Sequence, residues 1–178
     1  MALSTIDGLA PETDRQLANR RTLYAATTIV LTVIMGLGVV DALGWFDAYG
    51  VDTGTVRAAG GGYTLDVAYP SVSRPALASP FEIVVTRPGG FDGPVTLAVT
   101  GAYLKMWDEN GLVPAPAAET TDGEWVQWEF DPPDVDELTV FYDARIEPAV
   151  QSGETGKVAV IDNGRPVVEV EFRTEVRP

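Results

Sequence analysis

The sequence predicts a mainly β protein, with one N-terminal transmembrane helix followed by an immunoglobulin-like β-sandwich of about seven strands. Residues 23–40 (LYAATTIVLTVIMGLGVV) carry no charged side chain. A helix of that length covers roughly 27 Å, close to the thickness of a bilayer's hydrocarbon core. After residue 50, short runs of alternating apolar and polar residues are separated by turns rich in Gly, Pro, Asp and Ser, which is typical of a sandwich. The predicted parts are a short cytoplasmic head (1–22), the transmembrane helix (23–44), a juxtamembrane linker (45–53) and an extracytoplasmic β domain (54–178).

The charges on either side of the apolar run predict its orientation. Arg15, Arg20 and Arg21 precede the run, whereas Asp41 and Asp47 follow it. Because basic residues stay on the cytoplasmic side of a membrane, we expect a cytoplasmic N-terminus and an extracytoplasmic β domain. A cleaved signal peptide is the alternative. It fits less well, because the apolar run is longer than usual for a signal peptide and 22 residues precede it.

One face of the predicted span carries small side chains at helical spacing. They are Ala25, Thr28, Thr32 and Gly36, called the small-residue stripe below. Small residues let two helices approach closely in lipid, and threonine hydroxyls can hydrogen-bond across such a contact. The stripe is therefore a candidate for packing against another helix. The alternative is that the threonine hydroxyls bond back to their own helix.

Strict alternation predicts the strands in order. The alternating runs cover residues 63–69, 81–86, 95–99, 125–130, 138–147, 157–161 and 168–175. Asn163-Gly164 between the last two runs predicts a tight hairpin, because a type I′ turn needs positive φ at both central residues. Residues 101–123 break the rhythm and are predicted as a long insertion, with one helical turn or an irregular edge segment at 103–107. Either Trp125 or Trp128 is expected to be the core tryptophan.

Three stretches carry a resemblance to a known kind of protein. They are RPGGFDGPVTLAVTGAY (87–103), WEFDPP (128–133) and FYDARIEPAVQSGETG (141–156). The chain resembles single-pass membrane proteins of actinobacterial type, which have a short basic cytoplasmic head, one span and a β-sandwich ectodomain. The resemblance covers nearly the whole chain and implies this architecture. It implies no activity and no functional residue.

The composition argues against several kinds of chemistry. The chain has no cysteine and no histidine, which removes thiol chemistry, the commonest general base and the commonest zinc ligands. The formal charge of −14 disfavours nucleic acids and anionic headgroups as partners. Neither of the two lysines belongs to a Ser-x-x-Lys motif. We therefore predict no catalytic residue and no cofactor, and we do not expect an enzyme.

Two classes of function remain. The favoured one is a membrane-anchored, non-catalytic accessory or protein-interaction subunit that binds another membrane or envelope protein. Its interface candidates are side chains predicted to be exposed together, a combination that typifies interfaces: Tyr103, Met106, Trp107, Trp125 and Phe141. The alternative for these side chains is that they cover one end of the sandwich or pack under the long 101–123 loop. The alternative is an extracytoplasmic solute- or Ca²⁺-binding module, because residues 108–111 and 131–137 offer carboxylate oxygens. Neither segment has the spacing of an EF-hand loop, so no metal ligand is assigned.

Overall fold

The computed structural model describes residues 14–42 and 51–177. Residues 1–13 of the predicted head, the predicted helix end at 43–44 and residues 45–50 of the predicted linker lie outside the described residues. The chain divides into two compact units, Met1–Tyr49 and Gly50–Pro178, and each is treated by itself.

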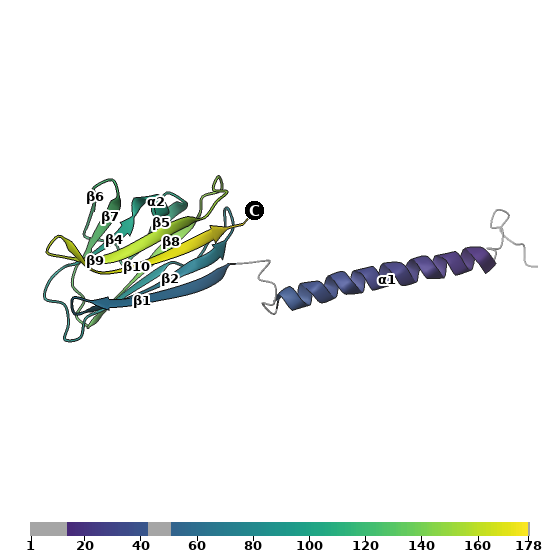
Figure 1. Cartoon of the computed structure of the whole chain (residues 1–178), viewed down its shortest axis with the longest axis horizontal. Helices are drawn as coiled ribbons and strands as arrows, with labels where there is room; N and C mark the ends of the chain where they lie inside the picture. The colour runs from purple at the N-terminus through teal and green to yellow at the C-terminus, as the bar shows by residue number, and fades with distance from the viewer. Residues whose placement is uncertain (1–13, 43–50, 178) are drawn as a thin grey trace, which may run out of the picture. The chain divides into compact units, whose positions relative to one another are not determined.

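The described residues of the first unit form one helix, α1 (Asp14–Ala42) (Figure 1). The most apolar 18-residue window of its stretch Asp14–Val40 has a mean hydropathy of 2.1, and the whole stretch is about 40 Å long at 1.5 Å per residue. The large apolar side chains from Leu23 to Val39 are 53% to 72% exposed. The helix is therefore long and apolar enough to cross a bilayer, as the sequence predicts.

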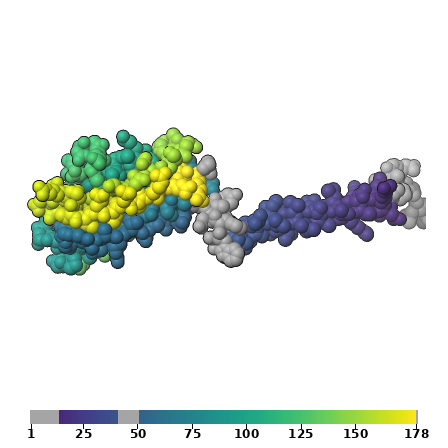
Figure 2. All heavy atoms as spheres, viewed as in Figure 1, coloured from purple at the N-terminus to yellow at the C-terminus, as the bar shows by residue number. Residues whose placement is uncertain are grey.

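The second unit is a β domain with ten described strands and one short helix. In chain order they are β1 (Asp52–Gly60), β2 (Tyr63–Ser73), β3 (Glu82–Thr86), β4 (Val95–Thr100), α2 (Gly101–Leu104), β5 (Trp107–Val113), β6 (Ala118–Thr121), β7 (Trp125–Phe130), β8 (Glu137–Ile146), β9 (Glu154–Asp162) and β10 (Arg165–Val176). The space-filling view in Figure 2 shows β10 and β1 running along one side of this domain.

The strands form two antiparallel layers. One layer has the order β1-β2-β3-β8-β5, and the other has the order β10-β9-β4-β7-β6. Among the described strands, the pairing that joins the two layers is a short parallel one between the end of β10 and Val72 and Ser73 of β2. The sheet thus curls onto itself, and Figure 1 shows β9, β10, β2 and β1 side by side at the join. This arrangement confirms the predicted β-sandwich-like domain behind an N-terminal apolar helix.

Alternating side chains from both layers fill the core. Phe81 lies at its centre, with ring centroids 5.5 to 6.0 Å from those of four other aromatic residues: Tyr103, Trp107, Tyr142 and Phe172. Trp128 is 1% exposed and its ring stacks on Tyr142, so of the two predicted candidates it is Trp128, not Trp125, that lies in the core, together with Trp107. The domain builds this core without a disulfide, because the chain has no cysteine.

Three strands, β1, β5 and β6, were not predicted. β1 is rich in Thr, Gly and Ala, and it begins at Asp52 inside the stretch predicted as linker. β5 has the sequence WDENGLV, whose Asn110-Gly111 indicates a turn. In the structure a register shift between Glu109 and Gly111 lets the strand continue, as a β-bulge does. The predicted helical turn is confirmed as α2, although it covers Gly101–Leu104 rather than 103–107.

Candidate functional site

The aromatic residues and the methionine of segment 101–123 do not form an exposed surface. Tyr103, Met106 and Trp107 are 0%, 4% and 7% exposed. The Tyr103 hydroxyl lies 2.9 Å from the Thr174 hydroxyl inside the core, and burial raises the pKa of Tyr103. The prediction that these three side chains are exposed interface residues is therefore wrong. For Trp107 the physical reason is that β5 pairs it with Ile146 of β8, and its indole packs against Phe81 in the core.

Two of the carboxylates considered for calcium, those of Asp108 and Glu109, are engaged within the sheet. Asp108 accepts hydrogen bonds from the Arg145 guanidinium at 2.6 and 2.8 Å. Glu109 accepts one from the Tyr142 hydroxyl at 3.2 Å. Within residues 14–42 and 51–177, no group of three or more Asp or Glu side chains is placed to hold a metal ion.

Phe141 faces outward, as the alternation predicts. Its side chain is 50% exposed, and the register sets it opposite Val113 of β5 and Glu82 of β3. Val113 is 61% exposed, so the two form an apolar pair on the outer face of their layer. Val113 was missed because β5 was not predicted as a strand.

Trp125 also lies on an outer face, that of the other layer. It pairs with Thr100 of β4 without a register shift, while Trp128 and Phe130 of the same strand face the core. The half-buried Trp125 lines a surface depression of about 200 Å³. The other lining residues come from the turn before β7, from β7 itself and from the β9–β10 hairpin: Asp122, Gln127, Ile161, Gly164 and Pro166. We call this site the Trp125 depression.

Two side chains fix the turn that leads into the Trp125 depression. The Asp122 carboxylate accepts hydrogen bonds from the backbone N–H groups of Glu124 and Trp125, at 3.0 and 2.8 Å. The Thr121 hydroxyl accepts the N–H of Gly123 and donates to the carbonyl of Trp125. The bonds from Trp125 and Glu124 lower the pKa of Asp122, so this carboxylate is charged at neutral pH. Sequence reasoning missed Asp122, although an Asp-Gly pair before a strand is a recognised turn signal.

We expect the free energy of unfolding of Asp122→Asn to change less with pH in the acidic range than that of wild type. The pKa of Asp122 in the fold lies below its ordinary value of 3.8. The charged carboxylate therefore contributes stability above that value, and the contribution is lost as the pH falls through the lowered pKa. Asparagine keeps an acceptor oxygen but does not titrate. Denaturant unfolding should show wild type more stable than the variant at pH 6, with a smaller difference at pH 2.5.

The control for this prediction is Glu124→Gln, which removes a neighbouring carboxylate but keeps both bonds to Asp122. A difference between wild type and Asp122→Asn that is the same at both pH values would contradict the assignment.

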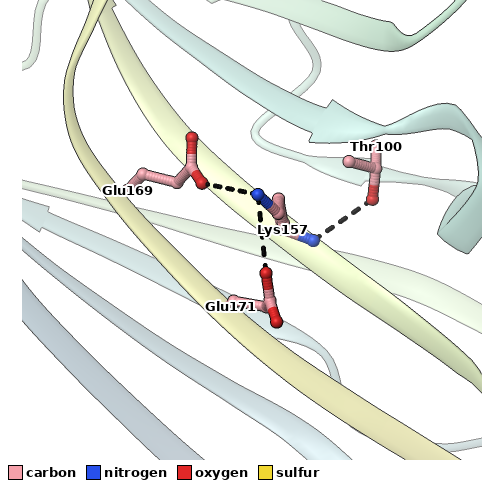
Figure 3. Close-up of polar contacts among 4 residues, drawn as sticks. All are labelled: Thr100, Lys157, Glu169 and Glu171. Atoms are coloured by element: carbon pink, nitrogen blue, oxygen red, sulfur yellow. Dashed lines mark hydrogen bonds and ion pairs between the residues drawn. The ribbon is translucent and has the colours of Figure 1, made fainter.

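Cross-strand ion pairs engage several of the domain's basic side chains. Lys157 Nζ lies 3.1 Å from a carboxylate oxygen of Glu169 and 3.4 Å from one of Glu171 (Figure 3). The backbone N–H of Lys157 donates to the Thr100 hydroxyl at 3.1 Å. Arg57 pairs with Asp66 and Arg145 with Asp108 in the same cross-strand manner. Since acidic residues outnumber basic ones by 26 to 12, these pairs leave an excess of unmatched carboxylates.

Two further depressions flank α2. They measure about 440 and 450 Å³ and share Ala102 and Lys105. The larger one also includes Lys157 and Glu124. Both are more open to solvent than the Trp125 depression, and neither is lined by a tryptophan.

The small-residue stripe lies on the exposed surface of α1. The Thr32 hydroxyl donates to the Thr28 carbonyl at 2.8 Å, which favours the alternative that this hydroxyl bonds to its own helix. A Cβ atom added at Gly36 would meet no atom within 4 Å. A second helix could pack closely against the stripe at Gly36 and Ala25. The Thr32 hydroxyl would not hydrogen-bond to that helix while it bonds to its own.

Comparisons with known proteins identify no family. No family model matches the chain, and no curated protein matches it. One similar solved structure is the Pseudomonas fluorescens alkylpurine DNA glycosylase AlkC bound to DNA containing an abasic site analog. The match has 12% identity and a TM-score of 0.29, and covers 61% of this chain and 28% of the glycosylase chain. Another is AvmM, which catalyses macrocyclization in alchivemycin A biosynthesis, with 10% identity, a TM-score of 0.33 and coverage of 72% and 92%. Both TM-scores are too low to support an argument about function.

Proposed function

We propose that this protein is a membrane-anchored, non-catalytic interaction subunit that presents an acidic β-sandwich-like domain outside the cytoplasmic membrane, where it binds another membrane or envelope protein. The observation that carries the proposal is the apolar surface of α1, where the large side chains are 53% to 72% exposed. Fully burying one such side chain is worth about 1.5–3 kcal/mol. A helix with this many exposed apolar side chains is stable in lipid rather than in water.

The charges around α1 support the proposed orientation. Arg15, Arg20 and Arg21 lie in its first turns, and Asp41 lies near its end. The retention of basic residues on the cytoplasmic side then leaves the β domain outside. Such a domain meets other envelope proteins rather than nucleic acids, which the chain's net charge of −14 would also repel.

Two outward-facing features of the β domain support binding to a partner. One is the apolar pair of Phe141 and Val113, and the other is the Trp125 depression. Exposed aromatic residues beside charged rims are typical of protein interfaces. They lie on opposite layers of the domain, so they offer two separate contact surfaces.

The test is co-purification of the tagged full chain in mild non-ionic detergent after cross-linking in cells, followed by mass spectrometry. We expect one or a few envelope proteins at stable ratios, reduced at least fivefold for a Phe141→Asp, Trp125→Ala double variant. The control is Asp92→Asn, Gln151→Ala, which changes exposed side chains elsewhere. Recovery of this chain alone, or of the same proteins with the double variant, would contradict the proposal.

The small-residue stripe gives a separate prediction within the membrane. Thr32→Leu with Gly36→Leu places two branched side chains on the stripe and should prevent close helix approach. We expect the recovery of any partner that contacts the span to fall at least threefold. Val30→Leu with Ile34→Leu, on another face of α1, is the matched control. If every partner survives the stripe variant unchanged, α1 serves only as a tether.

A further inference from the structure

The side chains around the Trp125 depression have a distinctive chemistry. The described lining residues supply one indole (Trp125), one carboxylate (Asp122) and one amide (Gln127), and none of them is Lys or Arg. Ile161 and Pro166 add apolar surface from the β9–β10 hairpin. The site therefore combines an aromatic wall with a fixed negative charge.

We propose that the Trp125 depression receives a cationic side chain of a partner polypeptide, an arginine or a lysine, with its charge beside Asp122 and its stem or guanidinium plane against the indole of Trp125. This inference rests on the proposed function and names the chemistry that one of its contact surfaces recognises.

The geometry of the turn explains why the Asp122 carboxylate can bind a cation. One carboxylate oxygen, Oδ1, accepts both backbone bonds, from Glu124 and from Trp125. These bonds tie the carboxylate to the backbone of Trp125, with which Asp122 lines the depression, and they do not involve Oδ2. Among aromatic residues, tryptophan attracts cations best, and a guanidinium also stacks on aromatic faces. Asp122 and Trp125 are thus held together by the same turn that starts β7.

The size of the depression favours a side chain over a free metabolite. Sites for drug-sized ligands usually measure about 300–1,000 Å³, whereas this one measures about 200 Å³. The end of one long side chain fits such a volume, while the rest of a partner lies outside it.

The charge around the depression favours the same occupant. The exposed Glu124 follows Asp122 in the turn, Glu129 is exposed on β7, and Asp162 is exposed in the hairpin. Arg165 is a base close to the depression, because it stands between the lining residues Gly164 and Pro166, although it is not itself a lining residue. Arg87 interacts with Asp162, and Lys157 lines a neighbouring depression together with Glu124. Since like charges repel, replacing Arg165 with glutamine is expected to strengthen binding of a cation about twofold or more.

The experiment uses the full chain, labelled with 5-fluorotryptophan, in micelles of a polyoxyethylene detergent that carries neither charge nor sugar. The chain has four tryptophans, so Trp125→Phe assigns the ¹⁹F signal of Trp125. The probe is N-acetyl-L-arginine amide, and the matched neutral probe is N-acetyl-L-citrulline amide, which has almost the same shape. We expect a saturable shift of the Trp125 signal with the arginine probe and at least about fivefold weaker binding of the citrulline probe.

Two variants make the result specific. Asp122→Asn keeps an acceptor for the turn and removes the charge, so it should weaken binding of the arginine probe by about fivefold or more while the Trp107 and Trp128 signals stay in place. Phe141→Ala, on the other layer, should bind the probe like wild type. Equal binding of the two probes, or no shift of the Trp125 signal, would overturn the inference. The oligosaccharide cellotetraose tests a sugar as the alternative occupant, and a shift caused by it but not by the arginine probe would also overturn the inference.

The same variants separate this inference from the proposed function. If Asp122→Asn still recovers every cross-linked partner at wild-type level and the arginine probe does not bind, the interaction subunit stands and the cation site is wrong. If the arginine probe binds selectively but no partner is recovered from cells, the cation site stands and the proposed function is wrong.

Discussion

Replacing Phe81 with alanine is expected to lower the free energy of unfolding of the β domain by about 3–5 kcal/mol, the usual cost of deleting a buried phenylalanine. Phe81 is 2% exposed, and its ring contacts rings from both layers of the domain, including Tyr142 of β8 and Phe172 of β10. The cavity left by the deletion would therefore lie where the layers pack together. Urea unfolding of the full chain in micelles, followed by tryptophan fluorescence, measures the change.

Phe141 provides the matched control for Phe81, because it is the same residue type at 50% exposure. We expect Phe141→Ala to change the free energy of unfolding by no more than about 0.5 kcal/mol, as is usual for surface substitutions. Similar losses for the two variants would show that the core is not centred on Phe81.

The second large effect is expected in α1. Leu31→Arg with Ile34→Arg places two charges in the middle of the predicted span. Each arginine at the centre of a membrane helix costs about 2.5–3.5 kcal/mol of insertion free energy, so the pair costs on the order of 5–7 kcal/mol. We expect the variant to leave the membrane fraction during an alkaline carbonate wash that wild type resists.

Leu31→Phe with Ile34→Phe is the control for the arginine pair, since it changes the same positions and keeps them apolar. This control should stay in the membrane fraction. If the double arginine variant also resists the wash, α1 does not anchor the chain through lipid contact.

The alternation of apolar and polar residues predicted strands such as β8 and β10 well, because one face of each of these two strands is buried. β8 and β10 alternate between exposed and buried residues along most of their lengths. The tight hairpin is confirmed as well, since Asn163 and Gly164 have φ values of 50° and 72°, as a type I′ turn requires. Gly61 and Gly62 form the β1–β2 turn in the same way, with φ values of 60° and 84°.

The edge strands could not be predicted from the same signal. All four residues of β6 are exposed. Because neither face of this strand is buried, its sequence, AETT, shows no alternation of apolar and polar residues. In β5 the pairing with β8 overrides the turn propensity of Asn110-Gly111. Because β5 was read as part of an insertion, Trp107 was expected on the surface, although it is buried beside Phe81.

The candidate site was only partly predictable for a similar reason. The outward direction of Trp125 follows from period-two alternation along one strand. The depression itself joins the turn at Asp122 with the hairpin around Gly164, two segments far apart in the sequence. Only the pairing of β4 with both β7 and β9 brings them to one face.

The central claim, an extracytoplasmic β domain behind a membrane anchor, is tested most directly by cysteine labelling. The chain has no cysteine, so Ser4→Cys in the head and Ser152→Cys at an exposed position of the β domain each introduce a unique thiol. A membrane-impermeant maleimide applied to intact cells should label Ser152→Cys at once and Ser4→Cys only after lysis. Labelling of Ser4→Cys alone in intact cells, or of neither variant before lysis, would contradict the account.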